Sequence, residues 1–439
     1  MHLGKRPSRL PADLQGVHGI EPASLDPRAA WAAVVERALE LRVDAVLLAG
    51  DVVDSGNHFM EAYGALHAGV QRLTKAGIDV VAVAGNHDVE ALPRLADELE
   101  GFVLLGRGGE WGSHVVERDG EPVVRILGWS FPRARVESSP LDALTTDLRE
   151  GRYADAGPDD LRTVGLLHCD LDAGGGHYAP VTRRELGQLA LGVSAWFLGH
   201  IHQPSIEGGG RPVGYLGSLV GLDPGEQGPR GPWLARSAAA SWELEQIVLS
   251  PVLWESVDID VSECAEREAV DPAITHALHD LAARLAPRLD GVRVVGVRPR
   301  LVGRTGLTGA ALAQAGEQAR ALQLDADGVL YFIDKVLDGT RPAIDLEALA
   351  QRNDPLAIVA RRLLELEAGG EACHRLIAAA RPRFAAVAGH ANFSRLGGET
   401  PGDGQIHAWL LRAASRALDE LLAQKGVSAG AAEAEEVQV

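Results

Sequence analysis

Between residues 27 and 88 the chain alternates between two hydrophobic periods, and this alternation restricts its fold more than any other feature. Residues 27–42 and 59–77 repeat apolar side chains at helical spacing, whereas residues 44–51 and 78–88 contain short apolar runs that end in turns. Helices that alternate with buried strands favour parallel strand pairing. The sequence therefore predicts an α/β domain.

Further apolar runs continue this pattern, each short and bounded by Gly, Pro or charged residues. They lie at residues 123–129, 163–170, 195–202 and 212–218. Residues 222–232 are dense in Pro and Gly and predict a loop, and the alternating residues that follow predict an antiparallel meander. We expect the first domain, residues 1–250, to end there.

Two further regions follow in the remainder of the chain. Residues 251–338 combine a helical stretch with apolar runs, which predicts a small α/β capping lobe. Within residues 339–439, residues 346–368 and 406–426 each predict one amphipathic helix, and the region ends in an acidic run, which predicts a helical C-terminal region with a mobile tail. The 439 residues are enough for two to four domains at roughly 100 to 200 residues each.

The composition is that of a folded protein, with 46% apolar and 23% charged residues. The three cysteines, Cys169, Cys264 and Cys373, form an odd and scattered set that suits neither a disulfide framework nor a cysteine-based zinc site. No apolar run approaches the ~18 residues that span a bilayer, and the start lacks the apolar core of a secretory signal. We therefore expect a cytoplasmic protein without a membrane segment.

Four polar clusters directly follow predicted strands, at the strand ends where α/β sheets bind their ligands. They are Gly-Asp-Val-Val-Asp at residues 50–54, Gly-Asn-His-Asp at residues 85–88, His168, and Gly-His-Ile-His at residues 199–202. Each cluster alone is compatible with a turn or a buried histidine. Together they supply oxygen and nitrogen donors without thiolates, which suits Mn²⁺, Fe²⁺ or Zn²⁺.

In this order the four clusters resemble the calcineurin-like metallophosphoesterase family. The HLGKR run at residues 2–6, the LLHCD run ending at Asp170, GHYAPV at residues 176–181 and GYLGSLVGLDPGE at residues 214–226 look like its DNA-repair exonuclease branch, the SbcD- and YhaO-like proteins. The resemblance covers residues 1–260 well and the remainder loosely. It implies a two-sheet sandwich flanked by helices, to which the capping lobe and the helical C-terminal region are attached.

The resemblance also implies a centre for two divalent metal ions, most consistent with Mn²⁺. In the family pattern Asp51 bridges the two ions, Asn86, His168 and His200 complete one, and His2, His202 and an aspartate two residues before His2 complete the other. Two such ions lower the pKa of a bridging water and neutralise charge during an in-line displacement at phosphorus. The ligand set therefore implies phosphoester hydrolysis.

The chain does not contain the last aspartate of that pattern, because Met1 directly precedes His2. Either the natural start lies upstream and supplies the aspartate together with a first strand, or the chain has lost part of one metal site. We expect the first, because all later clusters are intact and the loss of a central strand would leave its neighbours with unpaired backbone groups.

Three residues beside the ligands have expected supporting roles. His87 is expected to donate a proton to the leaving oxygen, and Asp88 to hold the tautomer of His87. A hydrogen-bonded turn is the alternative for this pair. Asp54 either supports a metal ligand or caps the following helix.

Binding to nucleic acid would need local positive charge, because 42 Lys and Arg against 61 Asp and Glu give a net charge of −19. Between residues 281 and 304 the capping lobe carries six arginines and one acid, Asp290. The arginines are Arg284, Arg288, Arg293, Arg298, Arg300 and Arg304. This strip is either a DNA-contacting surface or an ordinary set of solvent-facing arginines.

Partners follow from the resemblance alone. In SbcD-like nucleases a C-terminal helical element docks on a coiled-coil ABC-type ATPase, and residues 345–425 are candidates for that role. Such helices also commonly pack on their own domain. The chain has no P-loop, so ATP hydrolysis would require another chain. The sequence also leaves open whether the chain forms a homodimer.

Three functions remain at this point. The first is a Mn²⁺-dependent DNA exonuclease or endonuclease subunit in DNA repair. The second is a phosphodiesterase acting on small nucleotides, and the third is a catalytically silent scaffold of an ATPase–nuclease complex. The ligand set does not choose among substrates, because the family shares one core chemistry.

Overall fold

The computed structural model describes residues 1–54, 59–150, 161–173, 176–189, 192–238, 241–388 and 402–424. The chain divides into two compact units. The first comprises Met1–Val257, Thr275–Pro299 and Ala319–Val336, and the second comprises Asp258–Ile274, Arg300–Gln318 and Leu337–Val439. The predicted division into three regions differs from this grouping and stays a prediction.

Two sheets pack face to face in the first unit. The first has the order β1-β2-β3 and is parallel, with strands Ala45–Ala49, Asp79–Val83 and Phe102–Leu104. The second has the order β4-β5-β6-β7-β8, with strands Trp111–Arg118, Glu121–Trp129, Thr163–His168, Ala195–Gly199 and Val213–Tyr215. Apolar side chains of both sheets, among them Val81, Ile126 and Phe197, form the core between them.

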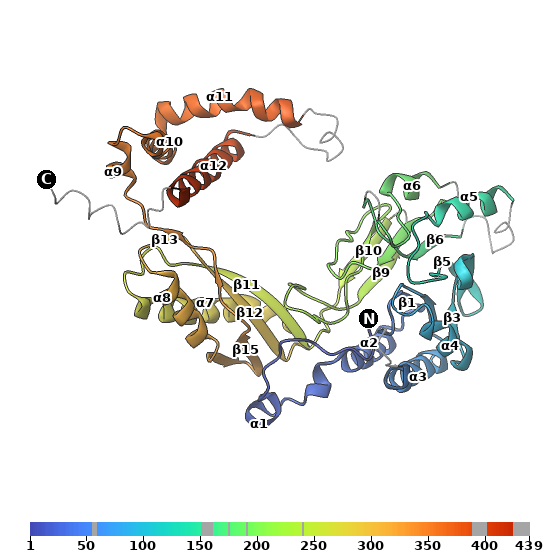
Figure 1. Cartoon of the computed structure of the whole chain (residues 1–439). Helices are drawn as coiled ribbons and strands as arrows, with labels where there is room; N and C mark the ends of the chain where they lie inside the picture. Colours follow the sequence, from blue (N-terminus) through green and yellow to red (C-terminus); the bar gives the residue numbers. More distant parts are fainter. Residues whose placement is uncertain are drawn as a thin grey trace. The chain divides into compact units, whose positions relative to one another are not determined.

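Helices cover the outer faces of both sheets. Trp31 and Leu66 of α2 (Pro27–Leu41) and α3 (Phe59–Lys75) pack on the first sheet together with α4 (Ala91–Glu98). Leu144 and Leu186 of α5 (Leu141–Arg149) and α6 (Arg183–Gln188) pack on the second sheet. Figure 1 shows the two sets of helices on opposite sides of the sheets. The predicted two-sheet sandwich flanked by helices is confirmed.

Local signals explain where these elements begin and which of them were predicted. Helix α2 begins where the Asp26 carboxylate accepts the main-chain amides of Arg28 and Ala29, with Pro27 in its first turn. The predicted strands at β1, β2, β5, β6, β7 and β8 are present. Strand β4 was not predicted, because half of its residues are only partly buried and the strand has no continuous apolar run.

Further strands follow along the chain. An antiparallel pair joins β9 (Trp233–Ala238) and β10 (Ser241–Gln246), and a separate sheet has the order β11-β12-β15-β14. These four strands are Val252–Asp260, Val294–Val302, Val329–Ile333 and Gln323–Ala326, and β16 (Leu337–Asp338) pairs with β12. Apolar side chains of α7 (Val270–Leu285) pack on this sheet. The N-terminal segment that includes α1 (Leu14–His18) packs in the first unit against Trp254 and Phe332.

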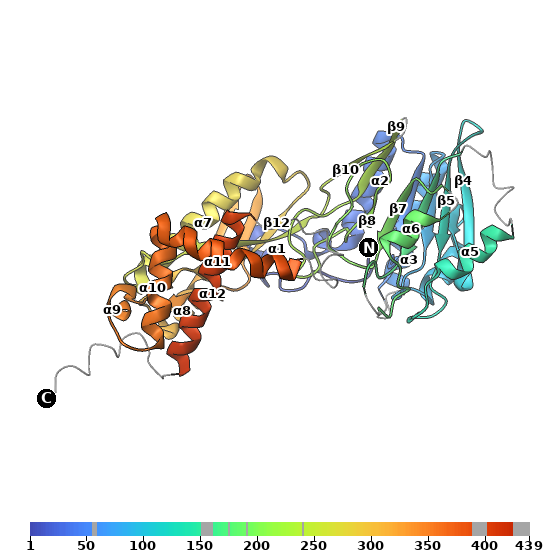
Figure 2. The same cartoon turned by 90° about the horizontal axis from the view of Figure 1, so that it is seen from above.

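The second unit contains the C-terminal helices. They are α9 (Leu346–Ala350), α10 (Pro355–Ala368), α11 (Gly370–Ala388) and α12 (Asp403–Gln424), preceded by α8 (Gly309–Ala319) and by the short strands β13 (Arg304–Thr305) and β17 (Arg341–Pro342). Helices α10, α11 and α12 pack together (Figure 2). A break at Asp354, which caps α10, separates two helices where one apolar stretch was expected.

The helical C-terminal region is therefore confirmed, whereas the predicted acidic tail lies outside the described residues. Among the described residues, none of the helices has the length and apolar character needed to cross a bilayer.

Candidate metal centre

The candidate ligands converge where strands of both sheets end. Asp51 follows β1, Asn86 follows β2, His168 ends β6, and His200 follows β7. The N-terminal segment lies beside the turn after β1, since the main-chain amides of His2 and Leu3 donate to the carbonyls of Asp51 and Val52 at 2.7 and 2.8 Å. The structure thus brings the six predicted ligands, His2, Asp51, Asn86, His168, His200 and His202, into one neighbourhood.

The Asp51 carboxylate lies between imidazoles that come from the two sides of the centre. Its Oδ2 atom is 3.4 Å from Nε2 of His168 and 3.7 Å from Nε2 of His2. Its Oδ1 atom accepts the main-chain amide of His87 at 3.0 Å. This is the placement that a carboxylate shared by two cations requires.

The first half of the centre consists of Asn86, His168 and His200, and we call it the Asn86 half. The Nδ1 atom of His168 donates to the carbonyl of Ala49 at 3.0 Å, which leaves the lone pair of Nε2 facing Asp51 and the Asn86 Oδ1 atom, 3.0 Å away. His200 lies beside His168, with ring centroids 5.2 Å apart, and its Nε2 atom is 3.0 Å from Asp170 Oδ1.

The second half consists of His2, His202 and Asp54, and we call it the His2 half. The Nε2 atoms of His2 and His202 are 3.0 Å apart. The Nδ1 atom of each ring contacts a carboxylate: Asp54 at 3.2 Å for His2, and Glu226 at 2.6 Å for His202. Both rings are therefore oriented with Nε2 toward the centre, as metal-binding histidines usually are.

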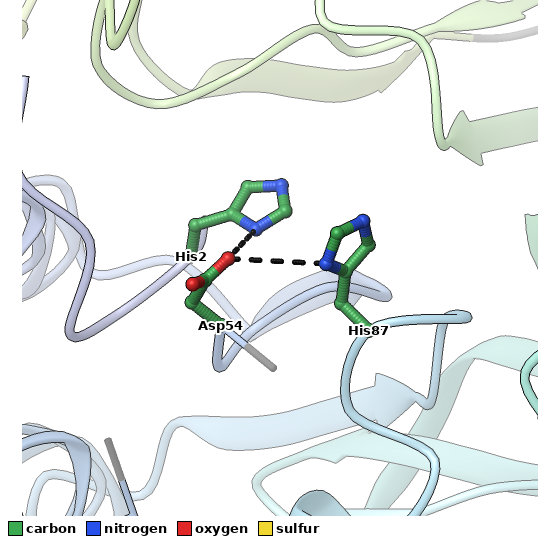
Figure 3. Close-up of side chains that lie close together, drawn as sticks. All are labelled: His2, Asp54 and His87. Carbon is green, nitrogen blue, oxygen red and sulfur yellow. Dashed lines mark hydrogen bonds and ion pairs between the residues drawn. The ribbon is translucent and has the colours of Figure 1, made fainter. Parts of the chain in front are cut away.

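Asp54 also lies next to His87. Figure 3 shows the Asp54 carboxylate joined by dashed lines to the imidazoles of both His2 and His87, with His87 Nδ1 3.8 Å from Asp54 Oδ1. Ligand atoms of these three residues all lie within 4.8 Å of one another. Of the two roles expected for Asp54, the structure favours support of a ligand.

Burial and charge put these groups in the protonation states that a cation needs. Burial lowers the pKa of both His2 and His168 to about 4, so that their imidazoles are neutral at pH 7. Burial raises the pKa of Asp51, but His168, His2 and the His87 amide offset this, and the net pKa is below its usual value. Neutral imidazoles around an ionised carboxylate fit two divalent cations.

The backbone at the centre adopts conformations that cost energy. His2, Asp51 and His200 have φ angles of 56°, 50° and 102°, in the left-handed region that costs a non-glycine residue about 1–3 kcal/mol. A Cβ atom on Gly85 would stand 2.3 Å from Asp51 Oδ1, so only glycine fits there. Strain and close packing of this kind are typical of functional sites.

The predicted role of Asp88 is wrong. Asp88 is 0% exposed, and its oxygens accept main-chain amides rather than a proton of the His87 ring. Oδ2 accepts from Val52 at 2.7 Å, and Oδ1 accepts from Gly85 at 2.7 Å. Asp88 thus ties the turn after β1 to the turn after β2, and burial together with the charge of Asp51 raises its pKa to about 7.

Two carboxylates of the centre were missed at the sequence level. Asp170 contacts His200, and Glu226 contacts His202 while its other oxygen accepts the Ser218 hydroxyl at 3.0 Å. Both lie in runs already noted, the LLHCD run and the Pro/Gly-rich loop, but neither run indicates which histidine its acid will meet.

Half of the arginine strip is paired with acids. Arg298 contacts Asp334 at 2.7 Å, Arg300 contacts Asp258 at 2.6 Å, and Arg304 contacts Asp419 at 3.5 Å. These pairs reduce the positive charge available to a phosphate backbone. The strip as a DNA contact stays a prediction.

Comparison with protein families agrees with this geometry. The model described as "Calcineurin-like phosphoesterase" matches residues 12–204, which carry Asp51, Asn86, His168, His200 and His202. Residues 12–204 form a calcineurin-like metallophosphoesterase domain. Residues 254–341 match a second model, described as "Metallophosphoesterase YhaO, middle domain", which extends the predicted resemblance beyond the phosphoesterase domain.

Curated relatives of this phosphoesterase domain include a nuclease subunit and a DNA double-strand break repair protein. The chain is 27% identical over 275 residues to the uncharacterized metallophosphoesterase YhaO of Bacillus subtilis, covering 58% of this chain and 60% of YhaO. It is 28% identical to one subunit of the nuclease SbcCD of Escherichia coli K12, covering 43% and 54% of the two chains. It is 30% identical to the DNA double-strand break repair protein Mre11 of Aeropyrum pernix, covering 47% and 48%. The matches span about half to three fifths of each relative's length.

Proposed function

We propose that this chain is a metal-dependent phosphodiesterase that cleaves DNA as a nuclease subunit in DNA repair. The observation that carries the proposal is the Asp51 carboxylate, whose Oδ2 atom lies between ring nitrogens of His168 and His2, 3.4 and 3.7 Å away. A shared carboxylate with two sets of nitrogen donors matches a centre for two cations.

The side chains named above would hold the cations, which we propose to be Mn²⁺. Two such ions would polarise the scissile phosphodiester, activate a water and neutralise charge on the entering and leaving oxygens. The chain's own contribution is orientation. Asp54, Glu226 and Asp170 each hold one histidine ring, which fixes the nitrogen that points into the centre.

His87 is the residue that we propose as proton donor to the leaving oxygen. Its main-chain amide is fixed on Asp51, while its side chain is 38% exposed and so can reach a bound substrate. Asp54, rather than Asp88, is the carboxylate beside its ring. A protonated imidazole there would release its proton as the phosphorus–oxygen bond breaks.

DNA is favoured as the substrate by the names of two relatives, one a component of a nuclease and the other a double-strand break repair protein. A phosphodiesterase for small nucleotides is the second candidate, and the acid-paired arginines of the strip favour it. A coiled-coil ABC-type ATPase partner, which rests on the resemblance, and a cytoplasmic location, which rests on the scattered cysteines, complete the proposal, and a homodimer stays open.

A cleavage assay separates these functions. The full chain is incubated with Mn²⁺ and either labelled duplex DNA or a cyclic nucleotide, with EDTA and the variant Asp51→Asn as controls. We expect Mn²⁺-dependent cleavage of DNA that both controls abolish. Cleavage of the cyclic nucleotide alone would overturn the DNA assignment, and cleavage of neither would favour a silent scaffold.

A further inference from the structure

A short basic segment, defined here as Lys5, Arg6 and Arg9, is held beside the His2 half of the centre. On one side Leu3 is fully buried and pairs with Val53 in the turn after β1. On the other side the main-chain amide of Ser8 donates to the carbonyl of Leu222 at 2.8 Å, and the Ser8 hydroxyl donates to Asp223 at 3.2 Å. The basic segment therefore spans from the turn that carries Asp51 to the loop that carries Glu226.

The three cations of the basic segment are exposed and meet no acid among the residues that the structure describes. In the described ranges no carboxylate forms an ion pair with Lys5, Arg6 or Arg9, and none of the three side chains donates a hydrogen bond. Asp223, an acid beside this segment, accepts the Ser8 hydroxyl and the Gly225 amide instead. These cations differ in this respect from the acid-paired arginines of the capping lobe.

The main chain holds this segment next to the centre. The turn in which the Lys5 amide donates to the His2 carbonyl at 3.1 Å keeps Lys5 close to that ligand. The protein has a net charge of −19, so exposed cations next to a phosphoesterase centre are a local exception to its overall negative charge.

We propose that Lys5, Arg6 and Arg9 form a phosphate-contacting surface for a nucleic-acid strand whose scissile phosphodiester lies at the metal centre. The inference rests on the proposed function for the position of the scissile group. Three cations distributed over five residues exceed what one phosphate can use, so they favour a strand with successive phosphates over a mononucleotide. Such contacts add affinity without reading sequence.

Salt dependence of binding tests this surface. The full chain and the variant K5Q/R6Q/R9Q bind a labelled DNA duplex in EDTA, where cleavage does not interfere, over a range of salt concentrations. Each lost contact lowers the slope of log K against log salt by about 0.9, so we expect the slope to fall by roughly 3 and binding at 0.1 M salt to weaken on the order of 100-fold.

Two control variants make the result specific. R37Q/R107Q/R236Q removes the same charge from exposed arginines that are paired with Glu40, Asp97 and Glu245, and it should leave the slope nearly unchanged. K5R/R6K/R9K keeps the charges and should keep the slope. Circular dichroism checks that all variants fold.

The proposed phosphate-contacting surface would be contradicted if the slope of log K against log salt stayed unchanged in K5Q/R6Q/R9Q. It would also be contradicted if the slope fell equally in the paired-arginine control. Absence of salt-dependent binding by the unaltered chain would also overturn it. The binding assay needs no turnover. If the chain does not cleave DNA but K5Q/R6Q/R9Q still shows the smaller slope, the result contradicts the proposed hydrolysis and not the phosphate-contacting surface.

Discussion

The two halves of the metal centre use similar donors but differ in how one of their histidines is held. In the Asn86 half, His168 is 0% exposed and is oriented by the main-chain carbonyl of Ala49, whereas His200 contacts the Asp170 carboxylate. In the His2 half, both histidines are oriented by carboxylates, and His202 is 30% exposed. His168 is thus fixed by the packed ends of the strands, whereas His202 reaches solvent.

This difference indicates how each half can change. A main-chain carbonyl is present whatever the residue type, so His168 keeps its orientation as long as β1 and β6 keep their places. Carboxylates raise the basicity of the imidazoles that they contact, but a single substitution removes them. We therefore expect the His2 half to exchange metal more readily and to be more sensitive to changes outside the ligands.

The largest effect is expected where the halves meet. Asp51→Asn should lower the rate of phosphodiester hydrolysis on the order of 10³-fold, because several kcal/mol of charge stabilisation are lost. Metal content, measured by plasma mass spectrometry, should fall for both halves. Asp44→Asn, which breaks an exposed pair with Arg118 at the other end of β1, is the matched control. Normal metal content in Asp51→Asn would contradict a shared ligand.

Removal of one histidine from each half sharpens the comparison. His168→Ala and His202→Ala should each lower the bound metal from two ions to one. Only His168→Ala should also destabilise the metal-free protein, by roughly 2 kcal/mol, because it empties a fully buried position. Denaturant unfolding in EDTA measures the stability of the metal-free variants. Equal free energies of unfolding for the two variants would contradict the proposed difference between His168 and His202.

The orienting carboxylates of the His2 half should have a smaller effect. Glu226→Gln and Asp54→Asn should weaken one of the two metal sites by about 10 to 100-fold and leave the other unchanged. Competition with a fluorescent chelator resolves the two affinities. Glu245→Gln, an exposed acid paired with Arg236, serves as the control for Glu226. Equal weakening of both sites would show that the halves are not independent.

The last prediction concerns the pH dependence of stability. The pKa values of His2 and His168 are about 4 in the folded protein, below the ordinary value of 6.5. As pH falls from 6.5 to 4 the unfolded chain binds protons that the folded rings do not, so the metal-free protein should lose stability over that range. The slope should approach two protons, or about 2.7 kcal/mol per pH unit. His168→Ala should remove about half of it.

Much of the fold followed from local patterns. Helical periodicity, short apolar runs and turn residues predicted α2, α3 and six of the strands of the two sheets, because each signal lies within a few consecutive residues. Strand β4 escaped prediction because its side chains are half buried and its pairing with β5 supplies the missing stabilisation. One helix was expected after residue 345, but the structure has two, α9 and α10. Asp354 separates them because its side chain accepts a main-chain amide of α10.

The candidate ligands were also predicted from their places at strand ends, and the structure brings all six together, although their binding of metal stays a prediction. Except for Asp54, their partners were not predicted. Asp170, Glu226 and the carbonyl of Ala49 orient rings that are 24 to 119 residues away in the chain. Asp88 was assigned to its sequence neighbour His87, but it contacts main-chain amides of the turn after β1.

By itself, the sequence determined the order of helices and strands, the carboxyl ends at which polar residues gather, and the kinds of donor atom available there. The tertiary structure decided which carboxylate holds which imidazole, which arginines are paired with acids, and which cations beside the centre meet no acid within the described part of the chain. The physical reason is range. Periodicity and turn formation depend on consecutive residues, whereas ion pairs and hydrogen bonds of side chains depend on where the packed sheets place groups that are remote in the chain.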